Sequence, residues 1–305
     1  MNSRLLKIRT ITEYHRVMGL PKPEHPLISV IDLESIKQAP PDGPFNLVFD
    51  FFSISLKKMQ GVKIKYGQQS YDFDEGVMFF IAPGQVFGIE PEHGGILKRS
   101  GWLLLVHPDF LWNTPLAKAI RQYDYFDYSV NEALFVSEKE KATIISLFQT
   151  MRQEYHSNID KFSQDIILSQ LALLLHYADR FYHRQFITRK ITNHQVLGRL
   201  EELLDRYFDG EEIVVKGLPS VGWVAEELNV SPGYLSGLLK VLTGLNTQQH
   251  IHQKLIEKAK EKLSTTEMSV SEIAYELGFG HPQSFSKLFK AKTKLSPLEF
   301  RQSFN

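Results

Sequence analysis

The side chains best suited to binding chemistry lie near the end of the chain, in a segment opened by a proline at residue 282. Its polar and basic residues are Gln283, Ser284, Lys287, Lys290, Lys292 and Lys294, with no acidic residue among them. Lysine offsets phosphate charge, and glutamine and lysine can hydrogen-bond the edges of purines. If a helix begins at Pro282, as proline at a first helical position favours, these side chains would face outward, toward a nucleic acid.

Other chemistries find little support. The chain has no cysteine, which excludes disulfides, thiolate zinc sites and cysteine nucleophiles. Nucleophile-elbow, phosphate-loop and dinucleotide motifs are absent from the sequence. His250 and His252 would point to different sides of a predicted helix. A helix face shared by His176, Asp179 and His183 could hold a metal, but ordinary polar residues are the favoured interpretation. We expect no cofactor, no metal and no enzymatic activity.

The composition is that of a globular protein. A chain of 305 residues suits two domains, and its hydrophobic content of 43% provides real cores. Lysine plus arginine and aspartate plus glutamate both number 35, so net charge alone indicates neither a nucleic-acid nor a membrane partner. The N-terminus has no apolar signal region, and the most apolar stretch, residues 166–175, is too short to span a bilayer. These features favour a cytoplasmic protein.

An internal repeat positions the polar segment. "SVGWVAEELNV" from residue 220 matches "SVSEIAYELGF" from residue 269, and "PGYLSGLLKVLTGL" from 232 matches "PQSFSKLFKAKTKL" from 282. Each copy predicts a short amphipathic helix, a turn of three to four residues and a second helix opened by proline. That is the plan of a helix-turn-helix, whose second helix presents its first residues to base edges. After residue 230 the chain has ten Lys and Arg against six Asp and Glu, a local excess of four positive charges.

A helix over 247–263 is predicted to link the two copies. Its buried stripe is expected to be Ile251, Leu255, Ile256, Ala259 and Leu263. Lys254, Lys258 and Lys262 lie four residues apart on another side. They form either a solvated face balanced by neighbouring glutamates or a set of phosphate contacts, and the sequence leaves both open.

The first part of the chain reads as strands followed by two helices. Alternation in "FSISLK" (52–57) and "VKIKY" (62–66) predicts half-buried strands joined by a hairpin turn at 59–61. Residues 77–82 and 102–107 read as more fully buried strands, and short strands of this kind suggest a sandwich or small barrel. A capping box at 137–140 opens a helix whose apolar face is Ile144, Phe148, Met151 and Tyr155.

The next helix, from about 161 to 186, is apolar nearly all round between 166 and 175. It must bury two surfaces, and we expect the second to be another subunit; a helix sunk between the sheet and its neighbouring helix is the alternative. Residues 187–194 are short and polar and mark a linker. After them the only strand-like run is 213–215.

The motifs together resemble those of the AraC/XylS family of bacterial transcription regulators. The resemblance is carried by "IAYELGF", "SFSKLFK" and "SPLEFR" and is specific over about the last 100 residues. Strands followed by a helical pair are similar to the cupin-type sensing and dimerisation domain common in that family. The resemblance implies an α+β protein with a cupin-like β-barrel or sandwich and helical pair in residues 1–186, a linker in 187–194, and an all-α domain with two helix-turn-helix motifs in 195–305.

The function implied is that of a sequence-specific transcriptional regulator controlled by a small-molecule effector. A regulator controlled by abundance or a protein partner is the alternative. A cupin-type enzyme with a DNA-binding tail is a weaker one, because the strands that would carry metal-binding histidines contain none. Implied partners are double-stranded DNA, an effector, a second copy of the chain and, for an activator, RNA polymerase; no membrane is implied.

Three sets of candidate residues follow. The resemblance carries the base-facing positions over to this chain, and the candidate DNA contacts are Ser231, Tyr234, Ser236, Lys240, His281, Gln283, Ser284, Lys287 and Lys290. Gly237 stands where the family often has a long polar side chain, so the first motif is expected either to contact mostly the DNA backbone or to read bases through Tyr234 and Ser236 alone. The candidate effector pocket is Phe49, Phe52, Tyr66, Phe79 and Trp102, for which plain core is the alternative. The candidate dimer interface is Leu168, Leu171 and Leu175.

Overall fold

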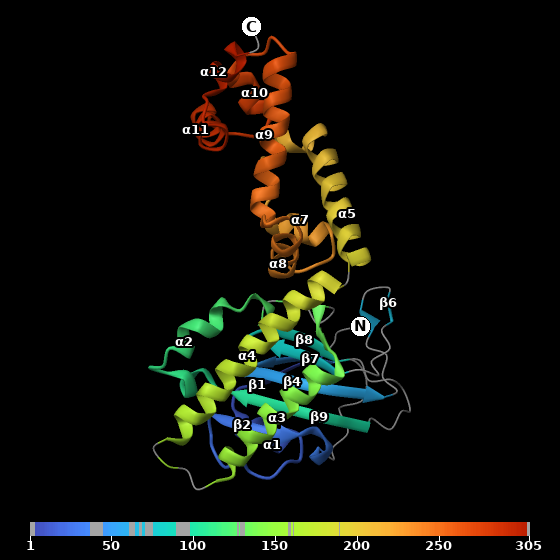
Figure 1. Ribbon diagram of the computed structural model, residues 1–305, viewed down its shortest axis with the longest axis vertical. Helices are drawn as coiled ribbons and strands as arrows, with labels where there is room; N and C mark the ends of the chain where they lie inside the picture. The colour runs from blue at the N-terminus through green and yellow to red at the C-terminus, as the bar shows by residue number, and fades with distance from the viewer. Residues whose placement is uncertain are drawn as a thin grey trace. The chain divides into compact units, whose positions relative to one another are not determined.

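A computed structural model describes residues 4–36, 45–60, 65–66, 69–70, 76–89, 98–126, 128, 132–157, 160, 162–188 and 190–303. The contacts of the chain divide it into two compact units, Met1–Gln185 and Phe186–Asn305. The first unit combines strands and helices, and the described part of the second is helical (Figure 1). The chain is therefore an α+β protein, as expected.

Two sheets and a short strand pair make up the β-structure of the first unit. The strands are β1 (Arg4–Ile8), β2 (Ile28–Asp32), β3 (Phe45–Phe49), β4 (Phe52–Gln60), β5 (Lys65–Tyr66), β6 (Gln69–Ser70), β7 (Gly76–Ile81), β8 (Val86–Ile89), β9 (Lys98–Val106) and β10 (Leu134–Val136). One sheet has the order β10-β7-β4-β9-β2 and is antiparallel; the other has the order β1-β3-β8. Among the described residues neither sheet closes on itself, so a cupin barrel is not confirmed.

Strand β4 differs from its prediction. Ser53 and Ser55 are as deeply buried as Ile54, with exposed fractions of 4% and 3%. They pair with Leu105 and Leu103 of β9, which belong to the core between the two sheets. The other face of β4 lies under helices, so both faces of this central strand are covered. The predicted hairpin turn is also wrong at Met59 and Gln60, which continue β4 in register with β9; Gly61 to Ile64 lie outside the described residues.

Helices α3 (Glu138–Tyr155) and α4 (Ser163–Thr188) cover one face of the five-stranded sheet (Figure 1). The predicted capping box is present at Ser137 and Glu140, and the four predicted apolar residues of α3 are buried. Phe148 stacks on Trp102 of β9 with ring centroids 6.1 Å apart. The remaining helices of this unit are α1 (Ile11–Val17), α2 (Leu116–Ala119) and the 3₁₀ turns η1 (Leu33–Ser35), η2 (Pro108–Leu111), η3 (Ile120–Gln122) and η4 (Asp124–Phe126).

Three of the apolar residues of α4 are covered within the first unit itself. Leu171 and Leu175 are fully buried and Leu168 is 8% exposed, so these three residues pack within the unit and cannot meet a second subunit. Packing within the first unit therefore accounts for the burial of these three leucines. The exposed apolar residues of α4 are different ones, Ile166 at 41% and Leu173 at 45%.

The second unit contains eight helices within the described residues. They are α5 (Lys190–Asp209), α6 (Glu212–Lys216), α7 (Val221–Glu227), α8 (Pro232–Thr243), α9 (Thr247–Thr265), α10 (Val270–Glu276), α11 (Pro282–Thr293) and α12 (Pro297–Gln302). The predicted linker is largely helical, because α4 runs to Thr188 and α5 begins at Lys190. The strand-like run 213–215 is also helical. Packing overrides the strand preference of its β-branched residues, since Ile213 is buried in the core of this unit.

The repeat forms two helix-turn-helix units, α7–α8 and α10–α11. Asn229 and Gly278 occupy the same place in the two turns and both have positive φ, 57° and 77°. The next residue closes each turn onto the first helix, with Val230 N–H donating to the Ala225 carbonyl at 3.0 Å and Phe279 N–H to the Ala274 carbonyl at 2.9 Å. The two turns therefore share one geometry although their sequences differ.

Gly278 has a second constraint that Asn229 lacks. A β carbon at Gly278 would lie 2.5 Å from the Ile213 carbonyl oxygen, so Gly278→Ala combines a steric conflict with an unfavourable φ. We expect this variant to lower the free energy of unfolding of the second unit by more than about 1 kcal/mol. Gly280→Ala is the control, because its β carbon would meet nothing within 4 Å. Hydrogen exchange of the α10 and α11 amides measures both, and equal effects would contradict the explanation.

Candidate nucleic-acid interface

The second helix-turn-helix exposes the polar start of α11. Phe285 and Phe289 are fully buried, with ring centroids 5.8 Å apart, and fix which side of α11 faces the core. Gln283, Ser284 and Lys287 therefore lie on the exposed side. His281 and Lys290, the other two candidates from this motif, are exposed as well. The structure thus gathers all five predicted residues of this motif on the solvent-facing side of α11 and at its start.

The N-terminus of α11 lies beside these exposed side chains and is not capped by a side chain. His281 is the N-cap residue, and within the described residues its side chain makes no capping hydrogen bond. Pro282 follows at the first helical position. Pro282 has no N–H and the Ser284 N–H donates to the His281 carbonyl at 3.0 Å, so it is the positive end of the helix dipole that favours a phosphate group here. This end of α11 is therefore suited to phosphate as well as to base edges.

The first motif is arranged differently. The Ser231 hydroxyl caps α8 by accepting from the Tyr234 N–H at 3.2 Å. The Ser236 and Thr247 hydroxyls are hydrogen-bonded at 2.9 Å, and Thr247 is fully buried. The Tyr234 ring packs edge-on against Phe186, 5.2 Å between centroids. Of the four predicted residues on this motif, Lys240 is exposed and the other three are half-buried. Helix α8 therefore presents fewer exposed polar side chains than α11.

The lysines of the linking helix are engaged in ion pairs. Lys254 pairs with Asp205, and Lys258 lies 2.6 Å from Asp209, both acids being on α5. Lys262 lies 2.7 Å from Glu276 of α10. The hydrogen bond to Asp209 is the main reason that the pKa of Lys258 is raised. Lys254 and Lys258 also lie 3.9 Å from Glu257 and 3.5 Å from Glu261, the neighbouring glutamates that the sequence offered as partners. The pairs with α5 and α10 attach α9 to its neighbours, and the sequence did not suggest those with Asp205 and Asp209 because they lie about 50 residues earlier.

The histidines do not form a metal site in the described part of the chain, where no group of three or more potential ligands gathers. His250 is hydrogen-bonded to Thr243 at 2.8 Å and His252 to Gln248 at 3.0 Å. Burial lowers the pKa of both histidines, and the charge of Lys292 lowers that of His252 further. At neutral pH neither histidine therefore adds positive charge to the candidate nucleic-acid interface.

The aromatic residues of the candidate effector pocket do not come together. Phe49 lies between the two sheets, and Phe79 lies in a separate small cluster beside β10. Phe52 and Trp102 face the opposite side of the sheet, against η4 and α3. The side chain of Tyr66 lies outside the described residues. Phe49, Phe52 and Phe79 are therefore buried in separate places, the half-buried Trp102 packs against α3, and the four described residues do not form the wall of one cavity.

Comparison with known proteins relates most of the second unit to helix-turn-helix domains. Residues 224–303 match a family model described as a helix-turn-helix domain. Over 141 residues the chain is 32% identical to the HTH-type transcriptional activator RhaS of Salmonella schwarzengrund, covering 46% of each protein. The chain thus spans about half the length of the curated relatives it matches.

Two solved structures are also similar. The C-terminal domain of the two-component response regulator yesN from Fusobacterium nucleatum is 31% identical, with 33% of this chain and 96% of that chain covered and a TM-score of 0.27. ToxT from Vibrio cholerae is 14% identical, with 90% of this chain and 98% of that chain covered and a TM-score of 0.29. Separately, no helix in the described residues is both long and apolar enough to cross a membrane.

Proposed function

The chain belongs to the AraC/XylS family of helix-turn-helix transcriptional regulators, and on that premise we propose that it reads a specific double-stranded DNA sequence, mainly through α11. The observation that carries this proposal is the exposed row Gln283, Ser284 and Lys287 above the buried Phe285 and Phe289. The family is one of regulators rather than enzymes, so an enzyme with a DNA-binding tail is set aside. We place the protein in the cytoplasm, with RNA polymerase as a partner if it activates.

Salt dependence tests the DNA-binding part of the proposal. Each phosphate contact releases counterions, so affinity for a random-sequence duplex should fall steeply as salt rises. Lys290 lies one turn beyond Lys287 and is suited to phosphate. Lys290→Ala is expected to weaken binding to all sequences and to reduce the slope of log affinity against log salt by about 1. Lys139→Ala, an exposed lysine of α3, is the control. Fluorescence anisotropy that finds the same slope for all three proteins would contradict the proposal.

We propose that the protein is a homodimer and that the exposed face of α4 forms the interface. Phe162, Ile166 and Leu173 are 56%, 41% and 45% exposed, and exposed apolar side chains that line up along one element commonly mark an interface. The residues first expected there, Leu168, Leu171 and Leu175, are buried and take no part. Ile166 and Leu173 of the proposed interface lie on the same helix as these leucines, and Phe162 lies just before it.

Charge substitutions on α4 distinguish its exposed apolar residues from its buried ones. Ile166→Glu combined with Leu173→Glu is expected to give folded monomers, because two carboxylates would enter the apolar contact. Leu171→Glu is instead expected to unfold the first unit, because it places a charge in the core. His183→Glu, at an exposed position further along α4, should stay dimeric. Sedimentation equilibrium checks all three, and a folded dimer of the double variant would place the interface elsewhere.

We also propose that an effector, if the protein is controlled by one, binds in the first unit and leaves the helix-turn-helix fold unchanged. The family resemblance of this unit supports the proposal. Ligand-induced protection from hydrogen exchange should then appear within the first unit, and protection confined to residues 190–305 would contradict it. Control by abundance or by a protein partner is the alternative, and it predicts that no small molecule gives such protection.

A further inference from the structure

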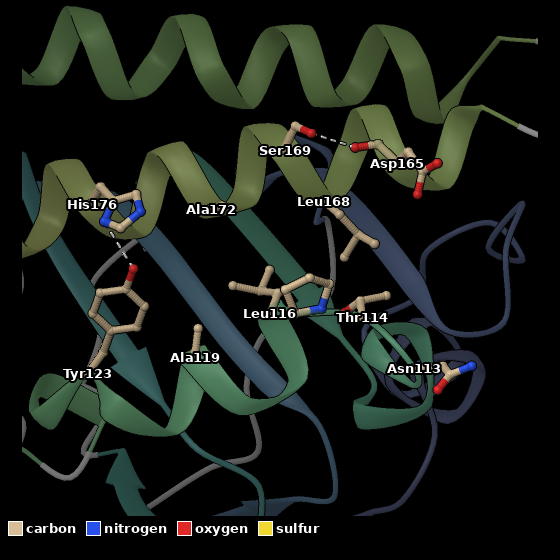
Figure 2. Close-up of a pocket in the computed structure, with 11 residues that line it drawn as sticks. Asn113, Thr114, Leu116, Ala119, Tyr123, Asp165, Leu168, Ser169, Ala172 and His176 are labelled. Carbon is tan, nitrogen blue, oxygen red and sulfur yellow. Dashed lines mark hydrogen bonds between the residues drawn. The ribbon is translucent and has the colours of Figure 1, made fainter.

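A groove of about 460 Å³ lies in the first unit, between the N-terminal half of α4 and the segment that contains α2 (Figure 2). It is distinct from the aromatic residues considered above. Its volume falls in the range of small-molecule sites, roughly 300–1,000 Å³. The groove therefore has the size of a ligand site, and the sequence did not suggest a ligand pocket in this region.

The middle of the groove is apolar. Leu116 and Leu168 are buried, with exposed fractions of 7% and 8%, and form its floor. Ala119 and Ala172 line it from the two opposing helices, and their short side chains leave the space between these helices open. Figure 2 shows these residues between two polar ends. An extended apolar body would replace water along this floor.

One end of the groove is a hydrogen-bonding pair. The Tyr123 hydroxyl and His176 Nδ1 lie 3.2 Å apart. Burial, and then the charge of Asp179, raise the pKa of Tyr123, so its hydroxyl stays protonated at neutral pH. It can donate to a ligand when His176 donates to it, or accept when it donates to His176. This end suits a hydroxyl or a carbonyl group.

The other end carries a carboxylate. Asp165 lies in the first turn of α4, and within the described residues its side chain has no ion-pair or hydrogen-bond partner of its own. Among the described lining residues there is no lysine or arginine to balance it. Asp165 and His176 are eleven residues apart on one helix, which corresponds to roughly 16 Å along its axis. A ligand that reaches both ends must be extended.

From this arrangement we propose that the groove binds an extended organic amine, with its ammonium group at Asp165, its apolar chain on the leucine floor and a hydroxyl or carbonyl at Tyr123 and His176. An anionic ligand of the same shape is disfavoured by the unbalanced carboxylate. The proposal names the chemical class of effector and in that respect rests on the proposed function. The groove shares α4 with the proposed dimer face at Ile166 and Leu173, so occupancy and subunit pairing would act on the same helix.

Calorimetry on the full chain with two matched probes tests the site. Aminooctanol has the required amine, apolar chain and hydroxyl, and hydroxyoctanoate replaces the amine with a carboxylate. We expect saturable binding of aminooctanol and at least about ten-fold weaker binding of hydroxyoctanoate. Asp165→Asn should weaken aminooctanol binding by a similar factor and remove the preference between probes. Glu34→Gln, an exposed acid on η1, should change neither.

A second test fills the groove with a larger side chain. Ala172→Leu should abolish aminooctanol binding, and Ala119→Leu should do the same from the opposite wall if the first variant fails to fold. Circular dichroism checks the fold. No saturable binding of aminooctanol, equal binding of both probes, or binding unaffected by the filled groove would overturn the proposal. DNA affinity measured on the same samples separates the outcomes, since lost DNA binding with intact amine binding counts against the proposed function alone.

Discussion

Lys287→Ala and Gln283→Ala are each expected to relax base preference at about one or two base pairs of the DNA site and to cost about 1–3 kcal/mol on the preferred sequence. Both side chains are exposed on α11, on the side away from Phe285 and Phe289. Base contacts discriminate between sequences, whereas phosphate contacts strengthen binding to all of them. Anisotropy titrations of the preferred duplex and its single-base variants measure the effect as lost discrimination.

The first motif supplies the comparison. Ser236 is hydrogen-bonded to the buried Thr247 and Tyr234 packs against Phe186, so we expect Tyr234→Ala and Ser236→Ala to change base preference less than the α11 variants do. Gly237, the residue after Ser236, adds no side-chain donor. The ranking of the two motifs would be wrong if the α8 variants erased the preference while Lys287→Ala left it intact.

Phe289→Ala is expected to destabilise the second unit by about 3–5 kcal/mol, the usual cost of truncating a buried phenylalanine. Phe289 is fully buried and contacts both Phe285 and Phe300, with ring centroids 5.8 Å and 5.5 Å away. Its loss would release α11 from the core and weaken DNA binding by disordering the reading helix. Hydrogen exchange of α11 and α12 measures the change in stability.

The matched control is an exposed aromatic residue of the same unit. Tyr275→Ala removes a side chain of α10 that is 53% exposed and should change stability by less than about 0.5 kcal/mol. If Phe289→Ala left α11 as protected as in the unchanged protein, the packing of the second motif would have to differ from that described.

Features set by local periodicity were predictable from the sequence. The five residues expected to form the buried stripe of α9 are all buried, Ile256 at 7% exposure and the others at 2% or less. The capping box of α3 and the helices opened by Pro232 and Pro282 also occur where the sequence placed them. Each of these depends on residues within one or two helical turns, so a short window of sequence contains the information.

Features set by distant neighbours were not predictable. Ser53 and Ser55 resemble the solvent side of a strand, but the three-stranded sheet covers them. Leu171 resembles an interface residue, but it is fully buried within the first unit. Ser236 resembles a base contact until the start of α9 brings Thr247 within hydrogen-bonding distance. In each case the residues that cover or bind the side chain lie too far away in the sequence for a local pattern to reveal them.

The central claim is that α11 reads base sequence through Gln283 and Lys287. Selection of bound duplexes from a random DNA library, carried out with the full chain and with the Lys287→Ala and Gln283→Ala variants, tests it most directly. We expect the unchanged protein to enrich a site with two elements about one helical turn apart, roughly 10 base pairs. Each variant should lose preference at positions within one of those elements. A library that shows no enrichment, or the same enriched site for all three proteins, would contradict the claim.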